Sequence, residues 1–308
     1  MPPKTPSLIR LGTRGSPLAL RQAETVRTGL MAAHPGLAVE IVPIRTTGDA
    51  VQDRRLSEIG GKGLFSKEIE QALRERRIEI AVHSLKDMET RLADGFVIAA
   101  VLPREDPRDA LIAPGVRTLA ELPPGAVIGT SSLRRQAQLL HRRRDLTVVA
   151  MRGNVGTRLD KLARGDAHAT LLAMAGLRRL DLTRHATLPL DPAIMLPAVG
   201  QGAIAVECRS DDAALRTMLD PLNDPGTAAC VTAERAMLAA LDGSCQTPIG
   251  GLATLGPDGT VTLDGLVATP DGARLERRRD SAPVAEAARL GDGIGHALRT
   301  AMGEDFPL

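Results

Sequence analysis

Arg14 and Ser16 combine a cation with a helix start directly after an apolar segment. In the stretch LGTRGSPLAL, Arg14 follows the apolar run and Ser16 precedes Pro17. A serine N-cap with proline at the first helical position is a strong signal for the start of a helix. The unpaired amides and the positive dipole end of such a helix bind anions. Arg14 and Ser16 are therefore candidate anion-binding residues.

Two arginines occupy a second predicted helix start, in the stretch AVIGTSSLRRQAQLL. Ser132 precedes the helix, and Arg134 and Arg135 lie in its first turn. Cations are disfavoured at a helix N-terminus. Their presence there indicates an anion that offsets the cost, whereas the alternative is that both side chains point to solvent.

A third junction, VVAMRGNVGTRLDKL, repeats the combination of a strand end, an arginine and a helix start. Arg152 directly follows the strand, and Arg158 lies one turn into the next helix, which Asn154 or Thr157 would cap. Arginine binds carboxylates and phosphates through paired hydrogen bonds. If these three helix starts face one cleft, they would bind a polyanionic ligand.

The fourth junction, IEIAVHSLKDMET, carries the candidate catalytic residue. Asp87 follows a buried strand and is a candidate acid, base or cation stabiliser, while Lys86 would bind an anion or lower the pKa of Asp87. His83, Ser84 and Asp87 are too close together in sequence to form a hydrolytic triad. A hydrogen-bonded structural histidine is the favoured interpretation of His83.

A glycine-rich stretch, IGGKGLFSKEIEQAL, looks like a phosphate-binding loop but departs from that pattern. Gly63 follows Lys62 where the motif needs serine or threonine. We interpret residues 60–63 as a flexible lid before a helix whose apolar face includes Ile69, Ala72 and Leu73.

The three cysteines, Cys208, Cys230 and Cys245, are widely spaced, which argues against a disulfide framework and a zinc site. Cys208 and Cys230 lie in strand and helix patterns and are expected to be buried. Cys245 lies in the loop DGSCQTPIG, without a nearby histidine that would act as a base. A covalent attachment point for a prosthetic group fits Cys245 better than a hydrolytic nucleophile does.

The overall composition limits the classes of partner. The net charge is only +2 and there is no Trp or Tyr, so a nucleic-acid binder is disfavoured. The N-terminus has no apolar signal core, and no run of 18 apolar residues occurs. We expect a cytoplasmic protein that binds neither nucleic acid nor membrane.

Apolar runs alternate with amphipathic helical patterns, which predicts an α/β protein. The expected strands are 8–12, 38–44, 78–83, 96–102, 126–130, 146–151, 168–173, 203–207, 260–269 and 274–279. The expected helices are 17–33, 65–76, 132–141, 155–163, 174–180, 211–219, 227–241 and 283–302.

The segments LPREDPRD and LPAVGQGA bracket a middle α/β block, so we expect a chain that leaves one lobe and later returns to it. This predicts two α/β lobes like those of periplasmic binding proteins, joined by a hinge that the chain crosses twice, with a ligand cleft. A small α+β C-terminal domain follows. A single large sheet is the alternative. The expected boundaries are 6–102 with 203–220 for lobe 1, 108–196 for lobe 2, and 225–308 for the C-terminal domain.

Taken together, the motifs resemble the porphobilinogen deaminase family from about residue 8 to residue 250. They are TRGSPLAL, GGKGLF, AVHSLKD, REDPRDAL, GTSSLRRQ, RGNVGTRL, LPAVGQGA and TAERAML, followed by the cysteine loop. The resemblance implies a transferase that condenses four porphobilinogen molecules on a covalent dipyrromethane cofactor and releases ammonia and a linear tetrapyrrole. It also suggests a monomer. Glu89 departs from the family pattern, which usually has proline at this position.

The resemblance also implies roles for single residues. Cys245 would carry the cofactor through a thioether, and Asp87 would assist ammonia loss and proton handling. Residues implied to hold the cofactor are Lys86, Ser132, Arg134, Arg135 and Arg158. Residues implied to contact substrate are Arg14, Ser16, Arg152, Arg179, Gln201 and Lys62. No metal is implied. The rival hypothesis is a two-lobed anion-binding protein of the periplasmic type.

Overall fold

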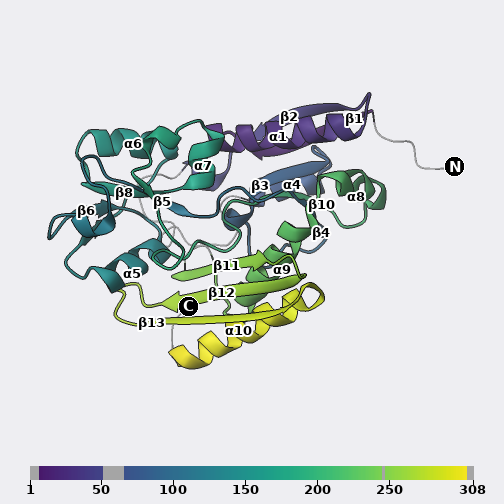
Figure 1. The fold of residues 1–308 in the computed structure, drawn as a ribbon. Helices are drawn as coiled ribbons and strands as arrows, with labels where there is room; N and C mark the ends of the chain where they lie inside the picture. The colour runs from purple at the N-terminus through teal and green to yellow at the C-terminus, as the bar shows by residue number, and fades with distance from the viewer. Residues whose placement is uncertain (1–6, 51–65, 245–246, 304–308) are drawn as a thin grey trace. The chain divides into compact units, whose positions relative to one another are not determined.

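The computed structural model describes residues 7–50, 66–244 and 247–303, which form two compact units (Figure 1). The described residues of the first unit are 7–50, 66–104 and 203–228, and those of the second are 105–202, 229–244 and 247–303. The chain therefore passes from the first unit to the second and returns before it ends in the second.

The first unit contains a five-stranded sheet in the order β2-β1-β3-β10-β4. Its strands are β1 (Leu8–Arg14), β2 (Ala38–Ile44), β3 (Ile80–Ser84), β4 (Phe96–Val101) and β10 (Ile204–Arg209). β1 pairs in parallel with β2 and β3, whereas β10 is antiparallel to β3 and β4. The carboxyl ends of β1 and β3 therefore meet at the edge where β10 begins.

Helices cover both faces of this first sheet. The helices of the first unit include α1 (Pro17–Ala33), α2 (Thr47–Ala50), α4 (Lys67–Arg74) and α8 (Ala213–Leu219), with short 3-10 turns η1 (Leu85–Asp87) and η4 (Asp220–Leu222). Val26 and Leu30 of α1 pack in the same cluster as Ile9 and Val82. Ile69, Ala72 and Leu73 of α4 pack with Ala81, as predicted for the apolar face of that helix.

The second unit contains a sheet with the order β7-β6-β8-β5-β9. Its strands are β5 (Asp109–Ile112), β6 (Val127–Gly129), β7 (Thr147–Val149), β8 (Ala169–Ala173) and β9 (Leu188–Pro189). The helices that accompany it are η2 (Leu119–Glu121), α5 (Leu133–Arg142), α6 (Val155–Ala163), α7 (Met174–Arg179) and η3 (Thr183–His185). β6 is parallel to β7 and β8, and β5 is antiparallel to β8, so this second sheet repeats the pairing of the first.

A three-stranded antiparallel sheet, β11-β12-β13, completes the second unit. It comprises β11 (Ile249–Leu255), β12 (Thr260–Ala268) and β13 (Leu275–Pro283), with helices α9 (Pro225–Ala240) and α10 (Ala287–Met302) and the turn η5 (Val284–Glu286). Met237, Val261 and Leu298 join these elements in one core. A Cβ on Gly291 would overlap the Ala233 carbonyl, so glycine is needed where α10 meets α9.

The predicted fold class is confirmed: two α/β sheets are followed by a small α+β region. The helices predicted at 17–33 and 155–163 match α1 and α6 residue for residue. Three strands were missed, β5, β9 and β11. β5 and β9 have only four and two residues, and glycines at 250 and 251 weaken the strand pattern of β11. Among the described helices, none has the length and apolar character needed to cross a membrane.

Candidate active site

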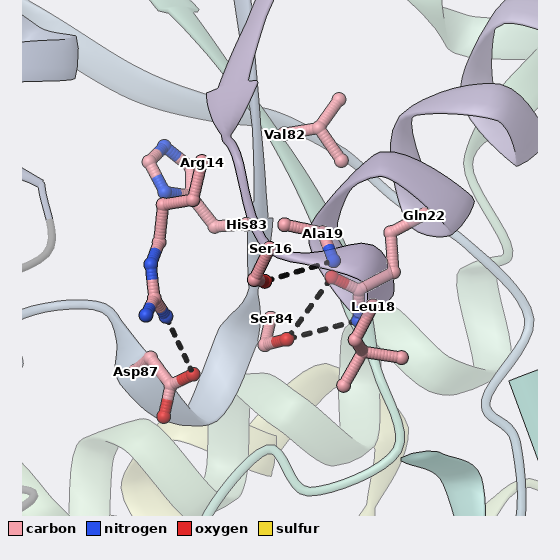
Figure 2. A pocket seen from close by; sticks show the side chains of 9 residues that line it. All are labelled: Arg14, Ser16, Leu18, Ala19, Gln22, Val82, His83, Ser84 and Asp87. Atoms are coloured by element: carbon pink, nitrogen blue, oxygen red, sulfur yellow. Dashed lines mark hydrogen bonds and ion pairs between the residues drawn. The ribbon is translucent and has the colours of Figure 1, made fainter. Parts of the chain in front are cut away.

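A small pocket lies at the carboxyl ends of β1 and β3 (Figure 2). The residues that line it come from the end of β1, the first turns of α1, and the end of β3 with the turn that follows. They are Arg14, Ser16, Leu18, Ala19, Gln22, Val82, His83, Ser84 and Asp87. The pocket therefore brings together the first and the fourth junctions of the sequence analysis.

Arg14 and Asp87 point toward one another in this pocket (Figure 2). Arg14 Nη1 lies 3.9 Å from Asp87 Oδ2, and the two side chains are 24% and 35% exposed. Asp87 ends the 3-10 turn η1, which the fully buried Leu85 anchors beneath it. A carboxylate and a guanidinium are thus held on a rigid strand end while both remain accessible to a ligand.

Ser16 begins α1 as predicted, and its Oγ accepts a hydrogen bond from Ala19 N at 3.3 Å. Gln22, one turn further on, exchanges hydrogen bonds of 2.9 and 3.1 Å with the hydroxyl of Ser84. These bonds tie the start of α1 to the end of β3. Lys86 lies half-buried in the same turn as Asp87.

His83 is a hydrogen-bonded, buried histidine, as predicted. Its Nε2 lies 2.9 Å from Oε2 of Glu207, and both side chains are nearly inaccessible. Glu207 comes from β10, which pairs with β3. Glu70 of α4 also interacts with this pair, and burial raises the pKa of the Glu70 carboxyl. A polar cluster therefore supports the strand end that carries Asp87.

Arg134 and Arg135 form a buried cluster with Asp109 in the second unit. Arg134 Nη1 lies 2.8 Å from Asp109 Oδ2, and Arg135 Nη2 lies 2.7 Å from Asp109 Oδ1. Both arginines are about 5% exposed and Asp109 is fully buried. Burial alone raises the pKa of Asp109, but the two guanidiniums outweigh it and hold that pKa well below its usual range. A carboxylate of the same protein therefore offsets part of the positive charge at this helix start, and the predicted binding of a ligand anion there stays a prediction.

Main-chain carbonyls hold the same two guanidiniums from other sides. Arg134 Nη1 also donates to Leu196 O, and Arg135 Nη1 donates to Leu171 O, each at 2.7 Å. The hydroxyl of Ser132 caps α5 by accepting from Arg135 N at 3.4 Å. The alternative in which both arginines point to solvent is wrong.

The remaining predicted arginines lie at helix and strand ends of the second unit. Arg158 Nε donates to Gly153 O at 2.9 Å, and the carbonyl of Arg152 accepts from Lys161 Nζ at 3.2 Å. Arg179 Nη2 donates to Gly202 O at 2.7 Å, and burial lowers the pKa of Arg179. The residues 152–158 share one helix start, which Asn154 caps by accepting from Thr157 N at 2.9 Å.

Comparison with known proteins identifies the family. The model of the porphobilinogen deaminase dipyromethane cofactor binding domain matches residues 9–217, and that of the porphobilinogen deaminase C-terminal domain matches residues 228–300. The chain belongs to the porphobilinogen deaminase family. Porphobilinogen deaminase of Paracoccus denitrificans (strain Pd 1222) is 54% identical over 301 residues, which cover 97% of this chain and 96% of that protein.

Two further likenesses extend the comparison. The chloroplastic porphobilinogen deaminase of Oryza sativa subsp. japonica is 50% identical over 306 residues, which cover 97% of this chain and 86% of that protein. A periplasmic substrate-binding protein of an ABC transporter from Coxiella burnetii matches with 16% identity and a TM-score of 0.45, over 74% of this chain and 96% of that one. The second likeness is too distant to bear on function.

Membership of the porphobilinogen deaminase family confirms the transferase activity, hydroxymethylbilane synthesis, and the dipyrromethane cofactor that the sequence analysis predicted. The roles of single residues stay predictions. Lys62 and Cys245 lie outside the described residues. Cys208 and Cys230 are buried as expected, and burial raises the pKa of the Cys208 thiol to about 11. Neither thiol is poised to react.

Sequence reasoning missed three buried carboxylates that organise the described part of this chain. They are Asp109, Glu207 and Glu234, each with an exposed fraction of 0%. Glu234 of α9 accepts hydrogen bonds from Gly200 N at 2.6 Å and from Ala253 N at 2.8 Å. The available signal was an acidic residue within an otherwise apolar run, as in IAVEC for Glu207.

Gln201, predicted to contact substrate, is 1% exposed. Its Nε2 donates to Pro107 O at 2.7 Å and to Asp109 Oδ1 at 2.9 Å. The amide nitrogen of Gln201 is therefore engaged by the protein itself, and Gln201 extends the cluster around Asp109.

Proposed function

We propose that Asp87 is the catalytic residue of hydroxymethylbilane synthesis in this chain, and that Arg14 and Ser16 bind a carboxylate of porphobilinogen beside it. The observation that carries this assignment is the 3.9 Å approach of Arg14 Nη1 to Asp87 Oδ2 in a pocket that both side chains line. A positive guanidinium and a helix N-terminus attract the substrate carboxylate. Asp87 then lies next to the reacting part of the bound molecule.

The chemistry assigned to Asp87 follows from charge. Loss of ammonia from the aminomethyl group of porphobilinogen leaves a positive charge on the methylene-pyrrole. A carboxylate about 4 Å away stabilises that charge by about 4 kcal/mol at an effective dielectric constant of about 20. When the new carbon–carbon bond forms, a proton must leave the acceptor pyrrole. Asp87 is the base that would accept this proton.

The residues of this chain fit a polyanionic cofactor such as dipyrromethane. Nε of Arg135 and Oγ of Ser131 are buried without a hydrogen-bond partner among the described residues, so this region has unused donors. The residues proposed to hold the cofactor carboxylates are Lys86, Ser132, Arg134, Arg135 and Arg158. The residues proposed to contact the growing chain are Arg152, Arg179, Gln201 and Lys62. When bound, the cofactor supplies the first acceptor pyrrole.

Cys245 is the proposed attachment point of the cofactor. Cys208 and Cys230 support this by elimination, because both are buried within packed clusters. A covalent tether keeps the intermediates on the protein while the chain grows by four units.

Intact-protein mass tests the tether. The wild-type protein, incubated with porphobilinogen, is expected to carry the mass of two linked pyrroles, and Cys245→Ser is expected to carry none and to release no ammonia. Cys208→Ala is the control, because it removes a buried thiol and should keep the added mass. Turnover by Cys245→Ser would refute the tether. A wild-type protein with neither adduct nor ammonia release would favour the anion-binding rival.

The proposed working form is a cytoplasmic monomer. Light scattering of the purified protein tests the monomer, and cell fractionation tests the compartment, for which a plastid is the alternative suggested by the Oryza sativa relative.

A further inference from the structure

Asp109 is the centre of a buried network that joins three residues of the proposed ligand-binding set. Its Oδ2 accepts from Arg134 Nη1, and its Oδ1 accepts from both Arg135 Nη2 and Gln201 Nε2. The three distances are 2.8, 2.7 and 2.9 Å. All four side chains are more than nine-tenths buried.

The direction of β5 explains how Asp109 reaches this place. β5 is antiparallel to β8, and Asp109, its first residue, pairs with Ala173, the last residue of β8. β6 runs parallel to β8 and ends at the same edge. The chain therefore enters the second sheet beside the start of α5, where Arg134 and Arg135 lie.

The charges of the network do not balance. Two guanidiniums carry two positive charges, and the one carboxylate between them carries one negative charge, which leaves an excess of one positive charge in a buried place. Nε of Arg135 also lacks a hydrogen-bond acceptor among the described residues. Buried charges are normally paired and hydrogen-bonded. One additional carboxylate would satisfy both the charge and the donor.

The other contacts show that the guanidiniums are fixed in place. Leu196 O and Leu171 O each accept from one of the arginines at 2.7 Å. Gln138 fixes Leu196 in turn, since its Oε1 accepts from Leu196 N at 2.7 Å and its Nε2 donates to Leu196 O at 3.0 Å. Arg134 and Arg135 thus have one defined arrangement, in which Asp109 is their shared anion.

We propose that Asp109 is a positioning residue, which fixes Arg134 and Arg135 and leaves the cluster with a single positive charge for one carboxylate of the cofactor. Asp109 does not touch the ligand and acts only through the two arginines. The inference rests on the proposed function, because that function supplies the carboxylate. It predicts that Asp109 affects loading of the cofactor more than the chemistry at Asp87.

The test compares Asp109→Asn with Asp109→Glu and with Asp264→Asn. Asp264 is the matched control, because it pairs with Arg277 at 2.6 Å in the second unit but lies outside the cluster. Chains made with no bound pyrrole are incubated with porphobilinogen, and intact mass follows the rate at which the adduct appears. The kcat and KM of the loaded fraction are measured separately, and thermal unfolding is recorded for each variant.

Asp109→Asn is expected to load about 10- to 100-fold more slowly, the size of loss seen when a residue that orients a metal ligand is removed. The loaded fraction should keep its kcat within a few-fold, since Asp87 is unchanged. Asp109→Glu should recover part of the loading rate because it restores the charge. Asp264→Asn should load at the wild-type rate even where its thermal unfolding shifts.

Loading by Asp109→Asn at the wild-type rate would overturn the inference, and so would equal slowing in Asp264→Asn at the same unfolding temperature. If Asp109→Asn does not fold, Asp109→Glu decides: slowed loading by a folded protein supports the inference, and wild-type loading overturns it. A wild-type protein that gains no mass at all refutes the proposed function instead, so the two failures are distinguishable.

Discussion

The first sheet and the second sheet have the same strand pairing, yet each places its carboxylate in a different environment. In the first sheet, β10 begins with Ile204, which pairs with Ser84 at the end of β3. In the second sheet, the corresponding strand β5 begins with Asp109, which pairs with Ala173 at the end of β8. The first sheet has an apolar residue at this position and carries its acid, Asp87, on the turn after β3.

The different positions of Asp87 and Asp109 give the two carboxylates different degrees of exposure. Asp87 lies on a turn, is 35% exposed, and faces Arg14 across a pocket. Asp109 lies inside a sheet, is fully buried, and is enclosed by two guanidiniums. An accessible carboxylate can respond to charge that develops on a ligand, whereas an enclosed one fixes its neighbours. The same sheet topology therefore places one carboxylate, Asp87, where it is accessible to substrate and another, Asp109, where it positions neighbouring side chains.

Asp87→Asn should have the largest effect on activity and almost none on stability. Loss of a general base and cation stabiliser lowers turnover by about 10²- to 10⁴-fold. Because the side chain is partly exposed and makes one long ion pair, the free energy of unfolding should change by less than about 0.5 kcal/mol. Ammonia release and urea unfolding measure the two quantities. Near-normal turnover would remove Asp87 from the mechanism.

Asp109→Ala should lower the free energy of unfolding much more than Asp87→Asn does, in the same urea unfolding assay. It leaves two buried guanidiniums without their shared anion, which costs about 3–5 kcal/mol of folding free energy. Urea unfolding of the second unit reports this loss. A destabilisation no larger than that of Asp87→Asn would contradict the contrast between the two sites.

The sequence was sufficient to predict the approximate positions of most helix starts and strand ends, because the signals for them are local. Ser16 with Pro17 predicted a cap that the structure has, and of the two candidates for α6, Asn154 and Thr157, Asn154 is the cap. The anion that faces Arg134 and Arg135 could not be identified from local patterns. Asp109 lies 25 and 26 residues before them, and its place depends on the antiparallel insertion of a four-residue strand. The pattern indicated an anion near the two arginines and left exposure to solvent open, whereas the position of Asp109 depends on the sheet order.

Acid should destabilise the protein partly through Asp109. Its folded pKa is depressed, so its contribution to stability is present above the unfolded value of about 3.9 and is lost as pH falls below it. The wild type should therefore lose stability between about pH 5 and pH 3 more steeply than Asp109→Asn, by up to about 1.4 kcal/mol per pH unit. Urea midpoints across this range measure the difference. Parallel curves for the two proteins would show that Asp109 is not held ionised.

The last comparison concerns two helix caps, one that follows a strand of each sheet. Ser16 caps α1 after β1, and Asn154 caps α6 after β7, each by accepting from the amide three residues later. Ser16→Ala and Asn154→Ala should each lower the free energy of unfolding by about 1 kcal/mol. Of these two residues, Ser16 lines the pocket with Asp87, so only Ser16→Ala should also raise KM for porphobilinogen, by about 10- to 100-fold for one hydrogen bond to a charged carboxylate. Equal KM values for the two variants would mean that the Ser16 hydroxyl caps the helix without contacting substrate, and Arg14 would then be the remaining carboxylate-binding residue of that pocket.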